Sequence, residues 1–567
     1  MLVTDNQLIL SVKDLQITFG DKDPFVAVNK ISFDIKKGKT LAIVGESGSG
    51  KSITAFALMG LLPKNAHVSG SIQLYANGRQ QAFSNHANDK SWQGIRGKAI
   101  GMVFQEPMSA LNPVMKIGKQ LAESIATHQQ QLNAEQVKQQ AVDWLRKVQL
   151  PNPEKLYDRY PHQLSGGQKQ RVVIAMAMCN HPVLLIADEP TTALDVTVQK
   201  EVVQLMNQLQ QEHDTAMIFI THDLALAAET ADEVLVMYRG EVMEHGDAKQ
   251  VLHDPQHAYT KALVACKPSP EQKGKRLPTV ADFMEPDKNG GNVRPEVDLP
   301  KVNVTNDILL DVKDLQVWFA EEKNIWGKPL SYFKAVKGVS FDMKKGEVLG
   351  LVGESGCGKS TVSRSLMGLL PVHEGQMIFD GKDLAKLSQG EWQQTRRDIQ
   401  MIFQDPFASL NPRMTIGDML AEPMRKHNTV SSSEVAKEAR RLLDLVQLPA
   451  NAIDRYPHEF SGGQRQRVGI ARALSLKPKL LICDESVSAL DVSVQAQILN
   501  LLKELQHEFH LSYLFISHDL SVVHYISDRV MVMQAGEIVE SGDASQVMMH
   551  PQHPYTRRLI DAMPELR

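Results

Sequence analysis

The sequence predicts an α/β protein with two tandem domains of one type, each built on a mostly parallel sheet. A glycine-rich loop, GESGSGKS from Gly45, recurs as GESGCGKS from Gly353. In the first copy the apolar strand VLLIAD, the helical segment VQKEVVQLMNQLQQEH and the strand AMIFITHD alternate as β-α-β. This order favours a parallel sheet with helices on both faces. A repeat of about 300 residues is too long for a solenoid unit and therefore indicates two whole domains.

Each copy is expected to begin with an antiparallel β part. The alternating segments LILSVKDLQITF and LLDVKDLQVWF open the two copies, and such alternation is typical of half-buried strands. An apolar strand then runs directly into each glycine-rich loop, and a helical segment follows it (SITAFALMGLL, STVSRSLMGLL). Strand, glycine loop and helix in this order are the context that a phosphate-binding loop requires.

A helical subdomain is expected in each copy after the glycine loop. The segments AEQVKQQAVDWLRKVQL and SSEVAKEARRLLDLVQL have apolar residues at helical spacing. Between the loop lysine and the glutamine of FQEP or FQDP, the first copy is longer than the second. Its additional residues fall around YANGRQQAFSNHANDKSW. We interpret this polar insertion as a surface loop.

The repeats also predict the domain boundaries. Residues 1–267 are expected to form the first domain and residues 307–567 the second. The intervening residues 268–306 are rich in proline, glycine and charged residues and lack apolar periodicity. We therefore expect a linker that docks in places and contains no helices.

The composition argues against several classes of protein. A formal net charge of −4 gives no basic excess of the kind that nucleic-acid-binding proteins have. The four cysteines, Cys179, Cys266, Cys357 and Cys483, show no CxxC spacing, which argues against a disulfide framework, a zinc site or an iron–sulfur cluster. No apolar run approaches the roughly 20 residues that span a bilayer, and no export signal is visible. We expect a cytoplasmic protein whose contact with a membrane is peripheral.

The glycine-rich loops have the features of a nucleoside triphosphate site. Their glycines let successive backbone N–H groups wrap a β-phosphate, and the following helix adds positive potential at its N-terminus. Lys51 and Lys359 are expected to bridge the β- and γ-phosphates, and the hydroxyls of Ser52 and Ser360 to contact Mg²⁺. ATP and Mg²⁺ are therefore the predicted cofactors. The loop residues that we expect to bind nucleotide are Gly45, Glu46, Ser47, Gly48, Ser49, Gly50, Lys51 and Ser52, and Gly353, Glu354, Ser355, Gly356, Cys357, Gly358, Lys359, Ser360 and Thr361.

An acidic pair ends an apolar strand in each copy. Asp188 and Asp484 suit a second contact to Mg²⁺, and the adjacent Glu189 and Glu485 are placed to orient or deprotonate an attacking water. Two glutamines in the sequences FQEP and FQDP are expected to reach both the metal and that water. These residues are Gln105 and Gln404.

One histidine follows each acidic pair and is expected to form a hydrogen bond with the γ-phosphate and so to sense its presence. His222 and His518 each lie 33 residues after the glutamate of their copy. A structural role is the alternative for a histidine taken alone. The equal spacing in the two copies favours the phosphate-sensing role.

A serine motif completes each copy, as LSGGQ in the first and FSGGQ in the second. Together these motifs resemble the ATP-binding cassette ATPases over nearly the whole chain outside the linker. The resemblance implies that two cassettes meet head to tail around two ATP molecules. Each ATP would contact the glycine loop of one cassette and the serine motif of the other. The implied serine-motif residues are Ser165, Gly166, Gly167 and Gln168, and Ser461, Gly462, Gly463 and Gln464.

The resemblance also implies that Phe19 and Phe319 stack on adenine. A position at the edge of the core is the alternative for both, and Tyr332 or Phe333 could take this role in the second copy.

The second copy departs from the family pattern at three positions. Ser486 stands where the first copy has Pro190, Cys357 lies inside the glycine loop, and Phe460 replaces a leucine. Because Glu485 is retained, we expect both sites to hydrolyse ATP, with slower turnover at the second site as the alternative. We interpret Cys357 as a small residue that fills the loop rather than as a redox switch.

Three further repeated stretches resemble the ATP-binding subunits of oligopeptide, dipeptide and nickel importers. They are FQEPMSALNP and FQDPFASLNP, RYPHQLSGG and RYPHEFSGG, and HDPQHAYT and HPQHPYT. The resemblance implies a peripheral ATPase on the cytoplasmic face of a bacterial inner membrane. Its implied partners are two transmembrane permease subunits and an external substrate-binding protein. Residues 107–122 and 406–421 would help to form grooves for a cytoplasmic helix of a permease.

The expected activity is ATP hydrolysis that drives peptide uptake, with glutathione, nickel and peptide antibiotics left open as cargo. The alternative class is a soluble twin-cassette ATPase that acts on ribosomes or DNA. Such proteins usually carry a charged helical arm or zinc-binding cysteine pairs, and the linker resembles neither. The cysteine-rich tail of many importer relatives is also lacking, so no iron–sulfur cluster is expected.

Overall fold

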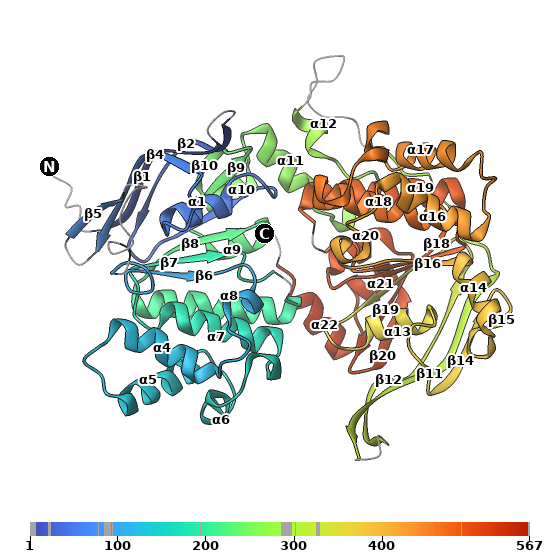
Figure 1. Cartoon of the computed structure of the whole chain (residues 1–567), viewed down its shortest axis with the longest axis horizontal. Helices are drawn as coiled ribbons and strands as arrows, with labels where there is room; N and C mark the ends of the chain where they lie inside the picture. The colour runs from blue at the N-terminus through green and yellow to red at the C-terminus, as the bar shows by residue number, and fades with distance from the viewer. Residues whose placement is uncertain are drawn as a thin grey trace. The chain divides into compact units, whose positions relative to one another are not determined.

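The computed structural model describes residues 7–20, 24–76, 79–83, 92, 94–192, 194–284, 297–300, 302–324, 329–488 and 490–564. The chain divides into two compact units, the first formed mainly by residues up to Val264 and the second mainly by residues from Ala265 to Met563. The two units have the same architecture, with corresponding elements in the same order (Figure 1).

Each unit contains a six-stranded sheet that is parallel except for one edge strand. The strand order is β10-β9-β3-β8-β7-β6 in the first unit and β16-β17-β18-β13-β19-β20 in the second. The edge strands β10 and β20 run antiparallel to their neighbours. The strands are β3 (Thr40–Val44), β6 (Ile100–Val103), β7 (Leu184–Asp188), β8 (Ala216–Thr221), β9 (Glu233–Tyr238) and β10 (Glu241–Asp247), and β13 (Val348–Val352), β16 (Ile399–Ile402), β17 (Leu480–Asp484), β18 (Ser512–Ile516), β19 (Arg529–Gln534) and β20 (Glu537–Asp543).

A four-stranded antiparallel sheet opens each unit, as the alternating sequence predicts. Its order is β2-β1-β4-β5 in the first unit and β12-β11-β14-β15 in the second. Leu10 of β1, Ile43 of β3 and Leu58 of the helix after the glycine loop belong to one hydrophobic core, so both sheets are packed around the loop. The strands are β1 (Leu8–Phe19), β2 (Phe25–Lys36), β4 (Ala66–Ala76) and β5 (Arg79–Phe83), and β11 (Ile308–Lys323), β12 (Pro329–Lys344), β14 (Glu374–Phe379) and β15 (Lys382–Asp383).

Helices form a second layer and a separate helical part that carries the serine motif. In the first unit, α4, α5 and α7 surround a core that includes Leu121, Trp144 and Val172 (Figure 1). The helix α5 begins at a capping box formed by Asn133 and Gln136, which satisfies its first free N–H groups. The helices of the first unit are α1 (Lys51–Leu58), α3 (Pro107–Ala110), α4 (Ile117–His128), α5 (Ala134–Lys147), α6 (Pro153–Tyr157), α7 (Gly166–Met178), α8 (Val196–His213), α9 (Leu224–Thr230), α10 (Ala248–His253) and α11 (Ala258–Cys266).

The second unit repeats this arrangement, and its helix α14 lies before its glutamine. The predicted helical segment SSEVAKEARRLLDLVQL forms α17, and STVSRSLMGLL forms α13. The fold class predicted from the sequence is therefore confirmed. The helices are α13 (Lys359–Leu366), α14 (Gln389–Asp398), α15 (Pro406–Ser409), α16 (Ile416–His427), α17 (Val435–Leu445), α18 (Gly462–Leu474), α19 (Val492–Phe509), α20 (Leu520–Ile526), α21 (Ala544–Met549) and α22 (Pro554–Asp561).

The polar insertion of the first copy is more regular than we expected. Residues 79–83 form strand β5, which pairs antiparallel with β4 from Ile72 to Ala76. The expectation of a surface loop is therefore wrong for this part, because backbone pairing with β4 satisfies the peptide groups of a polar segment. Residues 77–78 and 84–91 of the insertion lie outside the described residues.

The expectation of a linker without helices is also wrong in two places. A 3₁₀ turn covers Pro270–Gln272 and α12 covers Val280–Met284. Between them, the buried Leu277 donates its N–H to Asn500 Oδ1 at 2.9 Å and accepts from Asn500 Nδ2 at 2.8 Å. Residues 265–282 thus group with the second unit, since α19 supplies partners for the segment's peptide groups.

Asn500→Leu is expected to loosen this segment, because it leaves a buried N–H and a buried carbonyl without partners. Buried polar groups without partners cost about 1–3 kcal/mol each, so we expect the second unit to lose about 2–6 kcal/mol of unfolding free energy. Urea unfolding and hydrogen exchange of residues 273–280 would measure it. Gln204→Leu, at the corresponding exposed position of α8, is the control. Unchanged exchange in the Asn500 variant would contradict the expectation.

Candidate active sites

The glycine-rich loops connect β3 to α1 and β13 to α13. Gly45 has φ 149° and Gly353 has φ 151°. A Cβ at these positions would lie 2.1 Å from the carbonyl oxygen of Met237 and 2.2 Å from that of Met533. Glycine is therefore required both by conformation and by space, and it lets each loop close tightly over the start of its helix.

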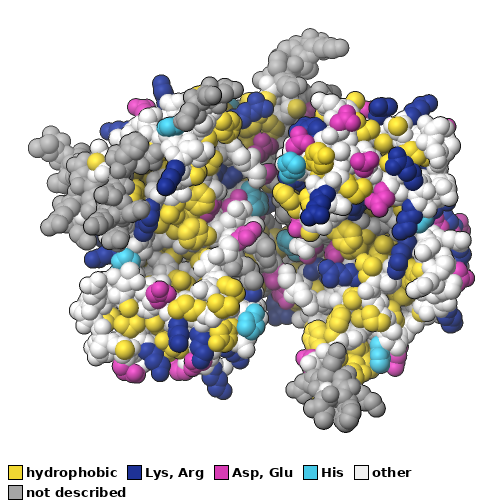
Figure 2. Space-filling view, viewed as in Figure 1, with side chains coloured by type: hydrophobic (Ala, Val, Ile, Leu, Met, Phe, Trp, Pro, Cys, Tyr) yellow, Lys and Arg dark blue, Asp and Glu magenta, His cyan; other side chains and the backbone are white. Residues whose placement is uncertain are grey.

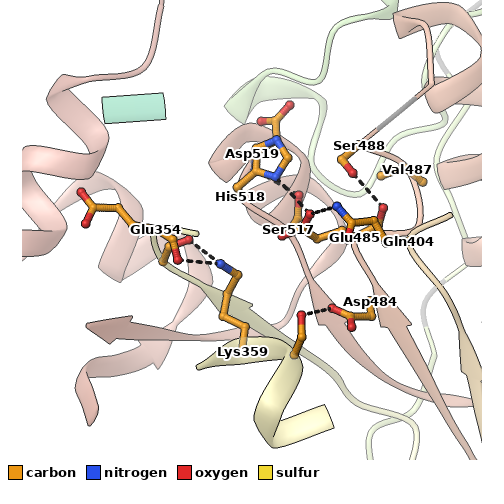
Figure 3. A network of polar contacts seen from close by, with 12 residues as sticks. Glu354, Lys359, Gln404, Asp484, Glu485, Val487, Ser488, Ser517, His518 and Asp519 are labelled. Carbon is orange, nitrogen blue, oxygen red and sulfur yellow. Dashed lines mark hydrogen bonds and ion pairs between the residues drawn. The ribbon is translucent and has the colours of Figure 1, made fainter. Parts of the chain in front are cut away.

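The loop lysines are buried and held by their own loops. Lys51 Nζ donates to the carbonyl oxygens of Gly45 and Glu46, both at 2.8 Å. In the second unit, Lys359 Nζ donates to those of Gly353 at 2.7 Å and Glu354 at 3.0 Å (Figure 3). Both ammonium groups thus lie against the backbone of a loop that is rich in N–H groups. A site for a polyphosphate needs this combination of positive charge and N–H donors.

The metal-binding residues predicted from the sequence meet in pairs. Ser52 Oγ donates to Asp188 Oδ1 at 3.0 Å, and Ser360 Oγ donates to Asp484 Oδ1 at 3.2 Å. Burial raises the pKa of Asp188 to about 6, although the Ser52 hydrogen bond opposes the shift, and burial likewise raises the pKa of Asp484. A hydroxyl and a carboxylate are the hard oxygen ligands that Mg²⁺ prefers, and a cation would offset the cost of a buried charge. These residues therefore fit the ion.

The predicted catalytic carboxylates lie beside the glutamine and the histidine of their own unit. Glu189 Oε2 accepts from Gln105 Nε2 at 3.0 Å and lies 3.4 Å from His222 Nδ1. Glu485 Oε2 accepts from Gln404 Nε2 at 2.7 Å and lies 3.7 Å from His518 Nδ1 (Figure 3). The two glutamines therefore contact the carboxylate, while their contact with a metal remains a prediction.

Both glutamates adopt a left-handed backbone, with φ 46° for Glu189 and φ 48° for Glu485. This conformation is uncommon outside glycine and is often found at functional sites. Burial alone would raise the pKa of Glu189, but hydrogen bonds and charges from His222, Thr192 and Lys51 outweigh it and lower the pKa to about 2. The pKa of Glu485 is also lowered, by His518 and Lys359 against burial. Both carboxylates are therefore ionised at neutral pH.

A difference between the sites lies three residues after each glutamate. The backbone turn is the same, since Thr192 N donates to Glu189 O at 3.2 Å and Ser488 N donates to Glu485 O at 3.3 Å. The hydroxyls differ, because Thr192 Oγ1 donates to the carboxylate oxygen Glu189 Oε2 at 2.9 Å. Ser488 Oγ instead donates to the backbone oxygen of Glu485 at 2.8 Å (Figure 3). The sequence did not point to this difference.

Thr192→Val should therefore affect hydrolysis more than the corresponding change at Ser488. Losing one hydrogen bond to the carboxylate is worth about 0.5–1.5 kcal/mol, which corresponds to roughly a 2- to 12-fold slower reaction at the first site. The steady-state rate of ATP hydrolysis would measure it, with Ser488→Ala as the matched control that leaves the rate unchanged. Equal effects of the two variants would show that the threonine does not orient Glu189.

The serine motifs begin the long helices α7 and α18. Ser165 and Ser461 are the N-cap residues, and each forms a capping box with Gln168 or Gln464. A Cβ at Gly167 would lie 2.5 Å from Val198 Cγ1, so this glycine is required by the close approach of α8. Within the described residues, no hydrogen bond joins a serine motif to the glycine loop of its own unit. Its role toward nucleotide therefore remains a prediction.

The aromatic residues predicted to stack on adenine lie at the ends of the first strands. Phe19 is half-buried against the core of its unit and is opposite Phe25. Phe319 is 39% exposed and is opposite Phe333, which is 51% exposed. Tyr332 lies one position before Phe333 in β12, close to Trp318, and is 46% exposed. All three aromatic residues of the second unit therefore stay candidates for stacking on adenine.

Sequence reasoning missed one pair of residues next to the loops. Tyr259 and Tyr555 are buried, and each hydroxyl accepts a hydrogen bond from the backbone N–H of the second loop residue. The signal was present in the sequence as the repeated His-x-Tyr-Thr near the end of each copy.

Comparisons with known proteins agree with this geometry. The family model described as "ABC transporter" matches residues 28–192 and 336–488. A second family model, "Oligopeptide/dipeptide transporter, C-terminal region", matches residues 243–289 and 539–567. Both models thus match the chain twice, once in each copy.

Curated relatives match nearly the whole chain. The "Glutathione import ATP-binding protein GsiA" of Escherichia coli (strain K12) is 47% identical over 567 residues, which cover 98% of this chain and 89% of that protein. The protein of the same name from Salmonella typhimurium is 47% identical over 564 residues, covering 99% of this chain and 90% of that protein. A solved structure described as "Dimeric Structure of MJ0796, a Bacterial ABC Transporter Cassette" is 28% identical and covers 41% of this chain and 98% of that chain, with a TM-score of 0.38.

Proposed function

Because the chain belongs to the ABC transporter family and carries that family's ATPase cassette twice, we propose that it energises the import of glutathione or other short peptides. The observation that carries this proposal is the 47% identity, over 98% of the chain, to a glutathione import ATP-binding protein. The match of both copies to the C-terminal region of oligopeptide and dipeptide transporters supports the same class of cargo.

In the proposed mechanism, each cassette binds ATP through its glycine loop, and Lys51 and Lys359 contact the β- and γ-phosphates. Ser52 with Asp188, and Ser360 with Asp484, would hold Mg²⁺, which supplies positive charge to the phosphates when it is bound. The ionised Glu189 and Glu485 orient the attacking water and accept its proton. Gln105, Thr192 and His222 all contact Oε2 of Glu189 and so help to fix the orientation of this carboxylate.

We further propose that the serine motif of each cassette completes the ATP site of the other. Ser165 and Ser461 lie at the N-termini of 13-residue helices, where free N–H groups and the helix dipole favour an anion. A γ-phosphate would draw these termini toward the opposite loop, and its loss would weaken the closure. Such closing and opening would be the movement that drives transport.

The proposed partners are two transmembrane permeases and an external substrate-binding protein, which would place the chain at the cytoplasmic face of a bacterial inner membrane. In the part of the chain that the structure describes, no helix is both long and apolar enough to cross a bilayer. The membrane path would therefore come from the permeases.

A cavity in the first unit supports the proposed permease contact. It has a volume of about 420 Å³ and is lined by residues that include Asn112, Met115, Gln120 and His128. Three of these belong to the segment 107–122, which the family resemblance implies helps to form a groove. In the second unit, Phe407 of the corresponding segment is 61% exposed, and the Arg465 guanidinium lies 3.4 Å from its ring centre.

The surface charge does not favour the alternative hypothesis, a twin-cassette ATPase that acts on ribosomes or DNA. On the face shown in Figure 2, the basic and acidic side chains of the described residues are interspersed. The formal net charge of −4 agrees with this mixture. A surface that binds the phosphate backbone of a nucleic acid would instead have lysine and arginine side chains clustered on one face.

Transport in vesicles would test the proposed function. The chain would be purified from membranes with the proteins that accompany it, and the complex would be reconstituted into liposomes with ATP. We expect ATP-dependent uptake of labelled glutathione or a short peptide, and none with Glu189→Gln and Glu485→Gln together. Uptake of nickel alone, or purification with ribosomes instead of membrane proteins, would refute the proposal.

A further inference from the structure

The His-x-Tyr-Thr elements at the end of each copy have no role in the mechanism proposed so far. They comprise residues 257–260 at the start of α11 and residues 553–556 at the start of α22. Both tyrosines are buried, with 0% of Tyr259 and 2% of Tyr555 exposed. Tyr259 lies 213 residues after Glu46 of its loop, and Tyr555 lies 201 residues after Glu354 of its loop.

Each tyrosine hydroxyl nevertheless reaches the glycine loop. Glu46 N donates to Tyr259 Oη at 3.2 Å, and Glu354 N donates to Tyr555 Oη at 3.1 Å. The carbonyl oxygens of the preceding residues, Gly45 and Gly353, belong to the same peptide units as these N–H groups, and they accept from the loop lysines at 2.8 and 2.7 Å. The peptide unit that joins the first two residues of each loop is thus held at its N–H by the tyrosine and at its carbonyl by the lysine.

The tyrosine is held in turn by a local network. Tyr259 N donates to His257 Nδ1 at 3.1 Å, and the carboxylate of Glu244 accepts from Gln256 N at 2.8 Å and His257 N at 3.1 Å. The second unit has the same three contacts, at 3.2, 2.8 and 3.0 Å. Both units thus share the sequence Pro-Gln-His-x-Tyr-Thr together with the contacts that hold the tyrosine.

We propose that Tyr259 and Tyr555 are positioning residues that fix the entrance of the glycine loop in a shape ready for phosphate. The C-terminal transporter region would then be part of the nucleotide site. A loop that binds through backbone N–H groups depends on the orientation of each peptide unit, so fixing the first peptide unit lowers the cost of ordering the loop on binding. The inference rests on the proposed role of the loops in ATP binding.

Removing only the two hydroxyls tests this inference. In the full chain with Tyr259→Phe and Tyr555→Phe, we expect the KM for ATP and the Kd for ADP to rise roughly 5- to 10-fold, the effect of one lost hydrogen bond at each loop. The kcat should change less, since the catalytic glutamates are untouched. Tyr238→Phe is the matched control, because it also removes one tyrosine hydroxyl and its ring centre lies 4.4 Å from that of Tyr259.

An unchanged KM and Kd would overturn the inference, and so would a lower melting temperature without a change in nucleotide affinity. If the tyrosine variant does not fold, Glu244→Gln with Glu540→Gln weakens the same network, and the same criteria apply. Lys51→Ala distinguishes a failure of the proposed tyrosine role from a failure of the proposed loop function. If that variant loses affinity while the tyrosine variant does not, the tyrosine role fails and the proposed loop function stands. If neither loses affinity, the loop assignment itself fails.

Discussion

ATP hydrolysis is expected to fall roughly 10²- to 10⁴-fold when Glu189 and Glu485 are both replaced by glutamine, the usual contribution of a general base. Glutamine keeps the size of the side chain but cannot accept the proton of the attacking water. Since the lysines and loop peptides are unchanged, ATP binding should remain. Phosphate release under saturating ATP and equilibrium nucleotide binding would measure the two effects separately.

The control for this experiment is Glu212→Gln with Glu508→Gln, because these residues occupy corresponding positions in α8 and α19 and are exposed. We expect this double variant to hydrolyse ATP at the unaltered rate. Retention of most activity by the variant at Glu189 and Glu485 would show that another group positions the water. Loss of ATP binding in that variant would show that the glutamates act in binding instead.

Lys51→Ala is expected to weaken ATP binding at the first site roughly 10- to 100-fold. The buried ammonium lies over the loop, and charge-assisted hydrogen bonds are worth about 1.5–3 kcal/mol each. Titration with a fluorescent ATP analogue should then show one weak and one unaltered site. Lys359→Ala should give the same pattern with the sites exchanged.

The exposed Lys249 of α10 provides the control, since Lys249→Ala removes the same charge at a distance from the loop. Unaltered affinity at both sites in Lys51→Ala would exclude the proposed phosphate contact. Weakening at both sites to the same extent would show that the two sites do not bind nucleotide independently.

The chemistry of the site could be predicted from the sequence because each part of it is a short local pattern. The glycine loop, the acidic pair and the histidine each follow a strand whose apolar residues are contiguous in the chain. The carboxyl ends of neighbouring parallel strands meet at one edge of a sheet, so recognising the strands was enough to bring Lys51, Glu189 and His222 together. In the structure, Glu189 Oε2 lies 3.4 Å from His222 Nδ1, and the charge of Lys51 helps to lower the pKa of Glu189.

The direction of individual hydroxyls could not be predicted. Thr192 and Ser488 occupy the same position in two nearly identical turns, yet one hydroxyl meets a carboxylate and the other a backbone oxygen. Threonine and serine differ by one methyl group, which restricts the rotamers of threonine. Local sequence therefore gives the turn, and the packing around it selects the rotamer.

The sequence by itself determined the two cassettes, their order of motifs and the residue types that handle ATP, because these depend on local patterns of apolar residues and glycine. Only the tertiary structure decided that Tyr259 supports the glycine loop 213 residues away and that Asn500 holds the segment around Leu277, 223 residues before it. The physical reason is the same in both cases. A buried peptide N–H must find an acceptor, but which distant side chain supplies it depends on how the whole unit packs.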